Sequence, residues 1–230
     1  MSDPQQMIEV LISRLVHDLK NPLAVVLSNM RFLQSSVTGV DEQDALRESV
    51  LSGERLDRMM DDAVDLGRMR GGRMSPASAA VVLSELEPAL SEKLDLLTGN
   101  RTLKFDLGPE RLMTDQALLL RILVNLGEHA LRQTPSRGTV LVQSEPVEQG
   151  LALRVIDGGA PFSPDVSPSF LDDALSVKDA PSAGCRSDQG LGLHFAGRAA
   201  CMLGAHIAVA PRSDAQGLVF ELVFGGEKLG

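Results

Sequence analysis

Aromatic side chains are scarce in this sequence, which has no Trp or Tyr and only seven Phe among its 230 residues. Leu, Val, Ala and Met must therefore fill most of the core, and this favours packed helices over aromatic-rich sheets. Cysteine is scarce as well. Cys185 and Cys201 are too few for a disulfide framework or a cysteine-based zinc site, so we interpret both as ordinary thiols.

Basic residues are outnumbered by acidic ones, with 22 Lys and Arg against 31 Asp and Glu and a formal net charge of -9. Binding to nucleic acid needs a clustered basic surface that neutralises phosphates, so the composition argues against a nucleic-acid partner. The first residues lack a basic segment followed by an apolar one, and no stretch approaches ~18 uninterrupted apolar residues. The sequence thus predicts a cytoplasmic protein without a membrane span.

A heptad spacing of apolar residues marks the first part of the chain. These residues recur at steps of four and three, and they are Ile8, Ile12, Leu15, Leu19, Pro22, Val26, Met30 and Leu33. A second helical pattern begins near Asp41 after a short loop, which predicts an antiparallel helical hairpin. Because one hairpin cannot enclose a core by itself, two copies are expected to form a four-helix bundle as a homodimer.

A run rich in Gly, Ser and Pro over residues 67–80 ends the heptad pattern and predicts a domain boundary at residues 75 and 76. Beyond this run, helical and strand patterns alternate. Helices are expected near 82–97, 115–132 and 191–203, strands near 102–107, 138–145, 151–157, 205–211 and 217–224, and a loop-rich section over 158–189. The sequence therefore predicts an α+β protein, with a hairpin in residues 1–75 and an α/β sandwich in residues 76–230.

His17 is the first candidate for chemistry. At about 100° per residue it lies roughly 200° from both Leu15 and Leu19, so it faces away from the apolar stripe. The neighbouring Asp18 can orient one ring nitrogen and raise the basicity of the other, and such an imidazole can accept a phosphoryl group. A solvated surface histidine is the alternative interpretation.

Two further residues near His17 favour the functional interpretation. Asn21 lies one helical turn further on and could orient a water for attack on a phosphohistidine, while Pro22 removes a backbone hydrogen bond of the helix. The segment HDLKNP, residues 17–22, resembles the H-box of two-component histidine kinases. The resemblance implies that His17 accepts the phosphoryl group, Asp18 assists autophosphorylation and Asn21 serves phosphatase activity.

Three segments of the second domain resemble the ATP-binding domain of the same family. They are the N-box helix at residues 115–135, the first glycine box VIDGGAP at 155–161, and the second glycine box with its helix and strand at 188–209. The resemblance implies the histidine kinase ATPase fold, with ATP and Mg²⁺ as ligands. The order and spacing of all these boxes are specific, whereas GLGL alone would be a weak signal.

Within this resemblance, four residues are expected to surround the nucleotide. Asp157 would accept a hydrogen bond from the adenine amino group, and Gly159 would let the base approach the backbone. Gly190 and Gly192 would present backbone N–H groups to phosphate near a helix N-terminus.

The N-box and the glycine boxes also depart from the family pattern. Asn125 is retained and is expected at the phosphates and the metal, and Arg132 is the retained basic residue. His129 replaces the second asparagine and is a poor substitute, because Mg²⁺ prefers oxygen ligands. The other departures are Gln133 for an aromatic residue, Pro161 for a glycine and Asp188 for the leading glycine of the second box.

The sequence leaves two functions open. As an enzyme, the protein would autophosphorylate His17 with ATP and transfer the phosphoryl group to an aspartate on a response-regulator receiver domain. The alternative is an ATP-independent histidine phosphotransferase, or a pseudokinase scaffold that docks a receiver. The departures favour reduced nucleotide use, whereas the intact GLGL, Asp157 and Asn125 favour binding, so we prefer the kinase. No sensory segment precedes the first helix in this sequence, so an upstream sensor or kinase is an expected partner.

The second domain contains three residues that could bind a metal ion. His194, His206 and Cys201 could in principle supply ligands. Their spacing does not make a convincing set, so these residues are interpreted as parts of the helix and strand of the core.

Overall fold

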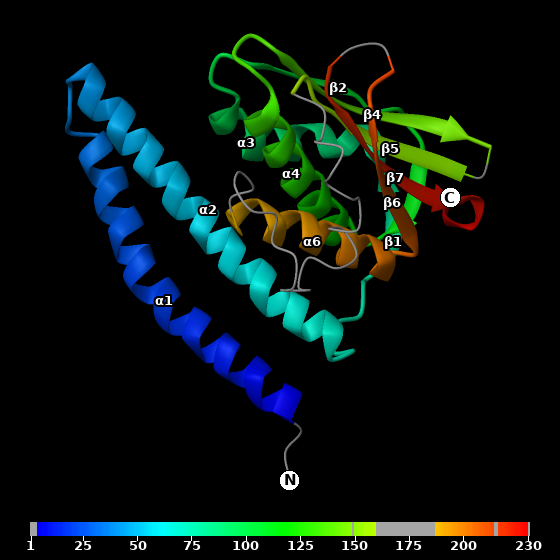
Figure 1. The fold of residues 1–230 in the computed structure, drawn as a ribbon, viewed down its shortest axis with the longest axis horizontal. Helices are drawn as coiled ribbons and strands as arrows, with labels where there is room; N and C mark the ends of the chain where they lie inside the picture. Colours follow the sequence, from blue (N-terminus) through cyan, green and yellow to red (C-terminus); the bar gives the residue numbers. More distant parts are fainter. Residues whose placement is uncertain (1–3, 149, 160–186, 214–215, 230) are drawn as a thin grey trace. The chain divides into compact units, whose positions relative to one another are not determined.

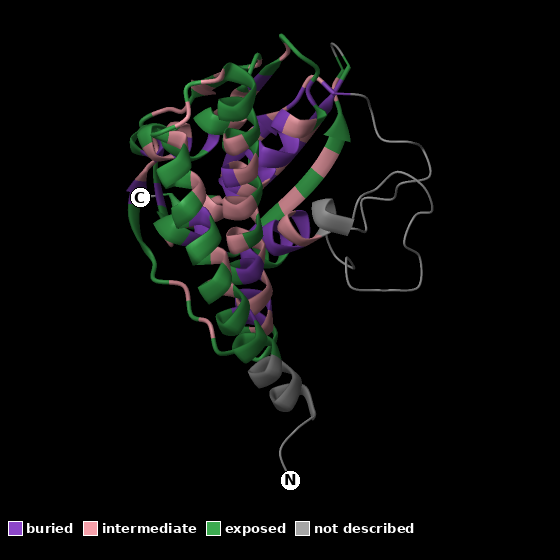
Figure 2. Ribbon diagram, turned by 90° about the vertical axis from the view of Figure 1, so that its left-hand side faces the viewer, coloured by how far each residue is buried: buried purple, intermediate pink, exposed green. Residues whose placement is uncertain are grey.

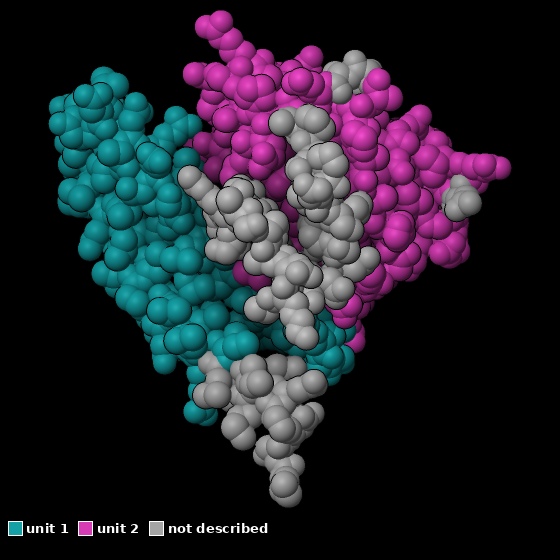
Figure 3. All heavy atoms as spheres, viewed as in Figure 1, with its two compact units in different colours: residues 1–74 teal, residues 75–230 magenta. Residues whose placement is uncertain are grey.

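The computed structural model describes residues 4–148, 150–159, 187–213 and 216–229, with the backbone alone for 4–11 and 187–190. The chain divides into two compact units, Met1–Met74 and Ser75–Gly230 (Figure 3). This division lies one residue from the predicted boundary. Among the described residues, no helix combines the length and the apolar character needed to cross a bilayer.

The first unit is a helical hairpin of α1 (Pro4–Gln34) and α2 (Val40–Arg70), shown in Figure 1. The termini of α2 carry charges that complement its dipole, with acidic residues in the first turn and basic residues in the last. Buried apolar residues join the two helices, among them Val16 and Leu27 of α1. A Cβ at Gly53 would lie only 2.6 Å from Leu27 Cδ2, so the glycine permits close packing of the helices there.

The heptad stripe of α1 is largely uncovered in the single chain. Leu15 is 60% exposed and Leu19 48%, although both are large apolar side chains. Helix α1 therefore has two apolar faces, because Val16 and Leu27 are buried while another set is exposed. The exposed residues of the heptad stripe are Ile12, Leu15, Leu19, Val26 and Leu33, and Val25 and Phe32 of α1 are exposed as well. Pairing of this face with a second copy stays a prediction.

The second unit contains a five-stranded sheet in the order β2-β4-β5-β7-β6. Strands β2 and β4 are parallel and the other neighbours are antiparallel, so the sheet is mixed. The strands are β2 (Thr102–Asp106), β4 (Thr139–Val147), β5 (Gly150–Ile156), β6 (Ala205–Pro211) and β7 (Leu218–Gly225). Alternate residues of β7 are buried, which is the pattern of a strand with one face toward the core.

Helices α3 (Glu87–Thr98), α4 (Gln116–Gln133) and α6 (Ser187–Met202) pack on one face of this sheet (Figure 1). Figure 2 shows the buried residues concentrated where helices and sheet meet. Asp115 caps α4, because its carboxylate accepts a hydrogen bond from the backbone N–H of Leu118 at 2.9 Å. The predicted α+β class, a helical hairpin followed by helices on one face of a mixed sheet, is confirmed.

Several elements differ from the sequence predictions. Strands β1 (Ala79–Val82) and β3 (Arg111–Thr114) form a separate antiparallel pair that the sequence did not predict, because four residues give too short an alternation. A 3-10 helix, Leu83–Leu86, precedes α3 where one helix was expected.

Helix α6 begins at Ser187 and not near residue 191, because a glycine that suggested a turn lies inside the helix. The expected loop falls mostly outside the described residues, and Pro161 and Cys185 lie there too. A second 3-10 helix, Gly226–Lys228, follows β7.

Candidate functional site

His17 projects from α1 with 75% of its side chain exposed. Its Nδ1 lies 3.3 Å from Asp18 Oδ1, so the carboxylate can hold a proton on that nitrogen and leave Nε2 with a free lone pair. Asn21 is also exposed and lies one turn further along α1. The structure therefore presents the three predicted residues of the H-box on the surface of one helix segment.

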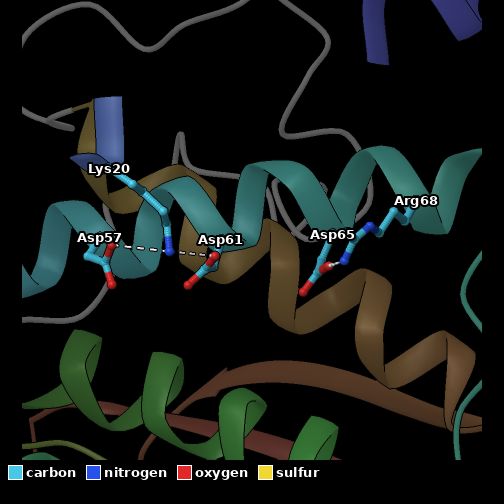
Figure 4. A network of polar contacts seen from close by, with 5 residues as sticks. All are labelled: Lys20, Asp57, Asp61, Asp65 and Arg68. Carbon is cyan, nitrogen blue, oxygen red and sulfur yellow. Dashed lines mark hydrogen bonds and ion pairs between the residues drawn. The ribbon is translucent and has the colours of Figure 1, made fainter. Parts of the chain in front are cut away.

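Lys20, in the same segment, connects α1 to α2. Its Nζ lies 3.1 Å from Asp57 Oδ1 and 2.7 Å from Asp61 Oδ1, as Figure 4 shows. Partial burial lowers the pKa of Lys20, but the hydrogen bonds and charges of Asp61 and Asp57 outweigh burial and leave that pKa raised. Sequence reasoning missed this residue, although an i,i+4 acidic pair on one helix and a basic residue on the other were visible.

Asp157 follows β5 and is fully buried. Its Oδ1 accepts hydrogen bonds from the backbone N–H groups of Gly159 at 2.8 Å and Leu218 at 3.0 Å. Its Oδ2 is buried and has no hydrogen-bond partner among the described residues. Burial raises the pKa of Asp157, although the two backbone hydrogen bonds and the charge of Arg212 act in the opposite direction. The carboxylate thus offers an unused acceptor to a donor of the kind that an adenine amino group supplies.

Thr134 joins the C-terminus of α4 to the first glycine box, and sequence reasoning did not find it. Its Oγ1 donates to the carbonyl of Ala130 at 2.8 Å and accepts from the backbone N–H of Gly158 at 3.1 Å. A Cβ at Gly159 would lie 2.7 Å from the carbonyl oxygen of Gln133. The glycine therefore permits close packing against α4, which is a reason independent of the predicted approach of a base.

Asn125 and Gly192 come together where α4 meets α6. A Cβ at Gly192 would lie 2.6 Å from Asn125 Oδ1, so glycine is required for this contact. Gly192 lies in the interior of α6, beyond the four residues whose N–H groups a helix start leaves unpaired. Its predicted role as a phosphate donor does not fit this position, whereas Gly190 lies in the first turns of the helix.

His129 is only 4% exposed and packs edge-on against Phe220 of β7, with ring centroids 5.3 Å apart and planes at 77°. Burial, with a contribution from the charge of Arg132, lowers the pKa of His129 to about 4, so the ring is neutral at pH 7. Neither ring nitrogen has a hydrogen-bond partner among the described residues. Arg132 itself lies 3.7 Å from Glu128 Oε2, one turn back on α4.

This environment does not suit Mg²⁺ at His129. The ion prefers oxygen ligands in octahedral geometry, whereas a neutral imidazole in an apolar contact offers only nitrogen. Of the predicted N-box site residues Asn125, His129 and Arg132, Asn125 is the one with a side-chain oxygen. Among the described residues, no group of three or more His, Cys, Asp or Glu side chains is arranged to hold a metal ion.

The comparison with protein families identifies the hairpin. Residues 7–72 match the model of the His Kinase A (phospho-acceptor) domain. The chain is a relative of sensor histidine kinases. Sensor histidine kinase CusS of Escherichia coli (strain K12) is 23% identical over 209 residues, which cover 90% of this chain and 43% of that protein. Sensor protein KdpD of Mycobacterium tuberculosis (strain H37Rv) is 29% identical over 161 residues, 65% of this chain and 18% of that protein.

Solved histidine kinase structures share the fold. The Acinetobacter baumannii histidine kinase AdeS has a TM-score of 0.60 and 17% identity, covering 91% of this chain and 97% of its own. Full-length ShkA in complex with AMPPNP has a TM-score of 0.64 and 21% identity, covering 92% of this chain and 44% of its own. The present chain spans less than half the length of the curated sensor kinases that it matches.

Proposed function

We propose that the chain is the phosphotransfer part of a histidine kinase, in which His17 takes the γ-phosphoryl group of ATP and passes it to an aspartate of a response-regulator receiver domain. The observation that carries the proposal is the exposed His17 beside Asp18, in a hairpin that matches the phospho-acceptor domain. An exposed nucleophile is needed because both the nucleotide and the receiver must reach the same ring nitrogen.

The contact between His17 and Asp18 assigns roles to the two ring nitrogens. With the proton on Nδ1 held toward Asp18, Nε2 attacks the γ-phosphorus of ATP. A P–N bond forms as the bond from that phosphorus to the β–γ bridging oxygen breaks, and ADP leaves with the electron pair. The Nδ1 proton is then released to Asp18 or water. In the second transfer Nδ1 takes up a proton again, a receiver carboxylate oxygen forms the new P–O bond, and the P–N bond breaks with its electron pair returning to Nε2 of neutral His17.

Asp157 is the residue that we assign to the base of the nucleotide. Its buried, unpartnered Oδ2 would accept the hydrogen bond of the adenine amino group, while Oδ1 is already occupied by two backbone donors. Asn125 and Arg132 remain candidates for the phosphates, together with the backbone of Gly190. Asn125 could offer an oxygen to Mg²⁺, whereas His129 does not suit that ion.

Two partners belong to this proposal. The exposed stripe of α1 supports a homodimer, because uncovered Leu15 and Leu19 leave apolar area that burial would stabilise by roughly 25 cal/mol per Å². The receiver domain is the second partner, and Asn21, one turn beyond His17, would orient water when the phosphoryl group is removed.

A second candidate function is supported by His129. Because the N-box lacks an oxygen at this position, the alternative is a phosphotransferase or pseudokinase that keeps the fold without ATP turnover.

Labelling with γ-labelled ATP tests the proposal. Wild type and His17→Ala are incubated with the nucleotide and Mg²⁺ or Mn²⁺. We expect an acid-labile, base-stable label on wild type alone. A wild type without label and without nucleotide binding by calorimetry would favour the alternative.

A further inference from the structure

We propose that Lys20 is a positioning residue that fixes the His17 segment of α1 against α2. The ammonium lies between two carboxylates of α2, 3.1 Å from Asp57 Oδ1 and 2.7 Å from Asp61 Oδ1 (Figure 4). Asp57 and Asp61 are one turn apart on the same face of α2. A cation held between two anions at different heights resists both sliding and rotation of α1, which a single ion pair does not. The catalytic part of this proposal rests on the proposed phosphorylation of His17.

The backbone explains why this segment needs a side-chain restraint. Pro22 lies inside α1 and has no N–H, so the carbonyl of Asp18 lacks its partner in the helix. The missing hydrogen bond spans the turn that contains Lys20 and follows His17. The bonds from Lys20 to α2 therefore restrain the segment in which the backbone has lost one of its own hydrogen bonds.

Few apolar residues of α1 close to His17 are buried against α2. Close packing occurs around Gly53, where an added Cβ would lie 2.6 Å from Leu27 Cδ2 and 3.6 Å from Leu23 Cδ1. Around His17, Val16 is buried while Leu15 and Leu19 are exposed. The orientation of the imidazole thus depends on a short stretch of α1 with few buried apolar neighbours on its own hairpin.

A second ion pair between the helices provides a matched control. Arg31 Nη2 lies 2.7 Å from Glu54 Oε1, so it also joins α1 to α2. At about 1.5 Å per residue, Arg31 lies roughly 21 Å along α1 from His17 and does not flank the Pro22 gap. Loss of this pair should therefore affect the stability of the hairpin as loss of the Lys20 contacts does, but not the orientation of His17.

The test compares Lys20→Met, Lys20→Arg and Arg31→Met with wild type in the full chain. Lys20→Met keeps the aliphatic stem and removes the charge. Because exposed ion pairs are individually weak, we expect a roughly three- to tenfold lower kcat for His17 labelling, with the KM for ATP unchanged. Lys20→Arg should restore most of the rate because it restores the cation, and Arg31→Met should label at the wild-type rate.

Amide hydrogen exchange adds a readout that does not depend on phosphorylation. Lys20→Met should accelerate exchange in peptides that span residues 17–24, and Arg31→Met should not. Equal loss of labelling in both Met variants, or unchanged exchange in Lys20→Met, would overturn the proposal, since the ion pair would then contribute only general stability. If wild type itself takes no label, the proposed function fails, and the exchange comparison alone decides whether Lys20 holds the segment.

Discussion

Replacing Asp157 with Asn tests the nucleotide pocket with little change in shape. The backbone N–H groups of Gly159 and Leu218 both donate to Oδ1, so they require an oxygen there and force the new amide nitrogen into the position of Oδ2. That nitrogen is a donor and would face the amino group of adenine, which is also a donor. Loss of a hydrogen bond to a charged group costs about 1.5–3 kcal/mol, or about 10- to 150-fold in Kd.

Isothermal titration calorimetry with ATP measures this effect directly. Asp106→Asn is the matched control, because Asp106 is an exposed carboxylate at the end of another strand of the same sheet. We expect the control to bind as wild type does and Asp157→Asn to bind at least tenfold more weakly. Equal affinity in all three proteins would refute the assignment of Oδ2 to the base.

The same substitution should also change how the free energy of unfolding depends on pH. Burial raises the pKa of Asp157, so the folded state holds this proton more tightly than the unfolded state. The resulting stabilisation is present below the unfolded pKa and is lost as the pH rises through the folded pKa. Asp157→Asn has no such loss. The free energy of unfolding of the variant minus that of wild type should therefore be larger at pH 7 than at pH 4. A constant difference in urea unfolding between these pH values would contradict the reasoning.

The remaining predictions concern His129 and the hairpin. Because the pKa of His129 is lowered to about 4, the free energy of unfolding should fall by up to about 3 kcal/mol between pH 7 and pH 4. His129→Leu should lack this part of the decrease when urea unfolding is measured at both pH values. His129→Asn should raise magnesium-dependent labelling of His17, because an amide oxygen is a harder ligand; lower labelling in a folded variant would mean that the imidazole is adapted to this site. Light scattering should give twice the monomer mass for wild type, and Leu15→Glu with Leu19→Glu should give the monomer; a folded wild-type monomer would remove the basis for the dimer.

Regular patterns made most of the fold predictable. The heptad spacing gave both hairpin helices, and alternation predicted all five strands of the main sheet, including β6 at its observed bounds. Short elements were missed because β1 and β3 have four residues each and are stabilised by pairing with one another. The start of α6 was misplaced because glycine has a low intrinsic helix propensity, and Gly190, just before the predicted start, lies inside the helix.

The candidate site was predictable where function depends on local sequence. His17, Asp18 and Asn21 lie within one segment, and Asp157 stands at the end of a recognisable strand. The contacts of Lys20 with Asp57 and Asp61 depend on how two helices align, which a heptad pattern does not specify. The contact of His129 with Phe220 depends on sheet packing in the same way, so the replacement was visible in the sequence but its apolar surroundings were not.

Mass spectrometry at neutral pH on the peptide that contains His17 tests the central claim most directly. The protein is incubated with ATP and divalent cation, digested without acid and compared with His17→Ala. We expect a phosphoryl group on the His17 peptide of wild type and none on the variant, and loss of the group on brief acid treatment. An unmodified His17 peptide from protein that binds ATP, or a phosphoryl group on another residue, would contradict the account.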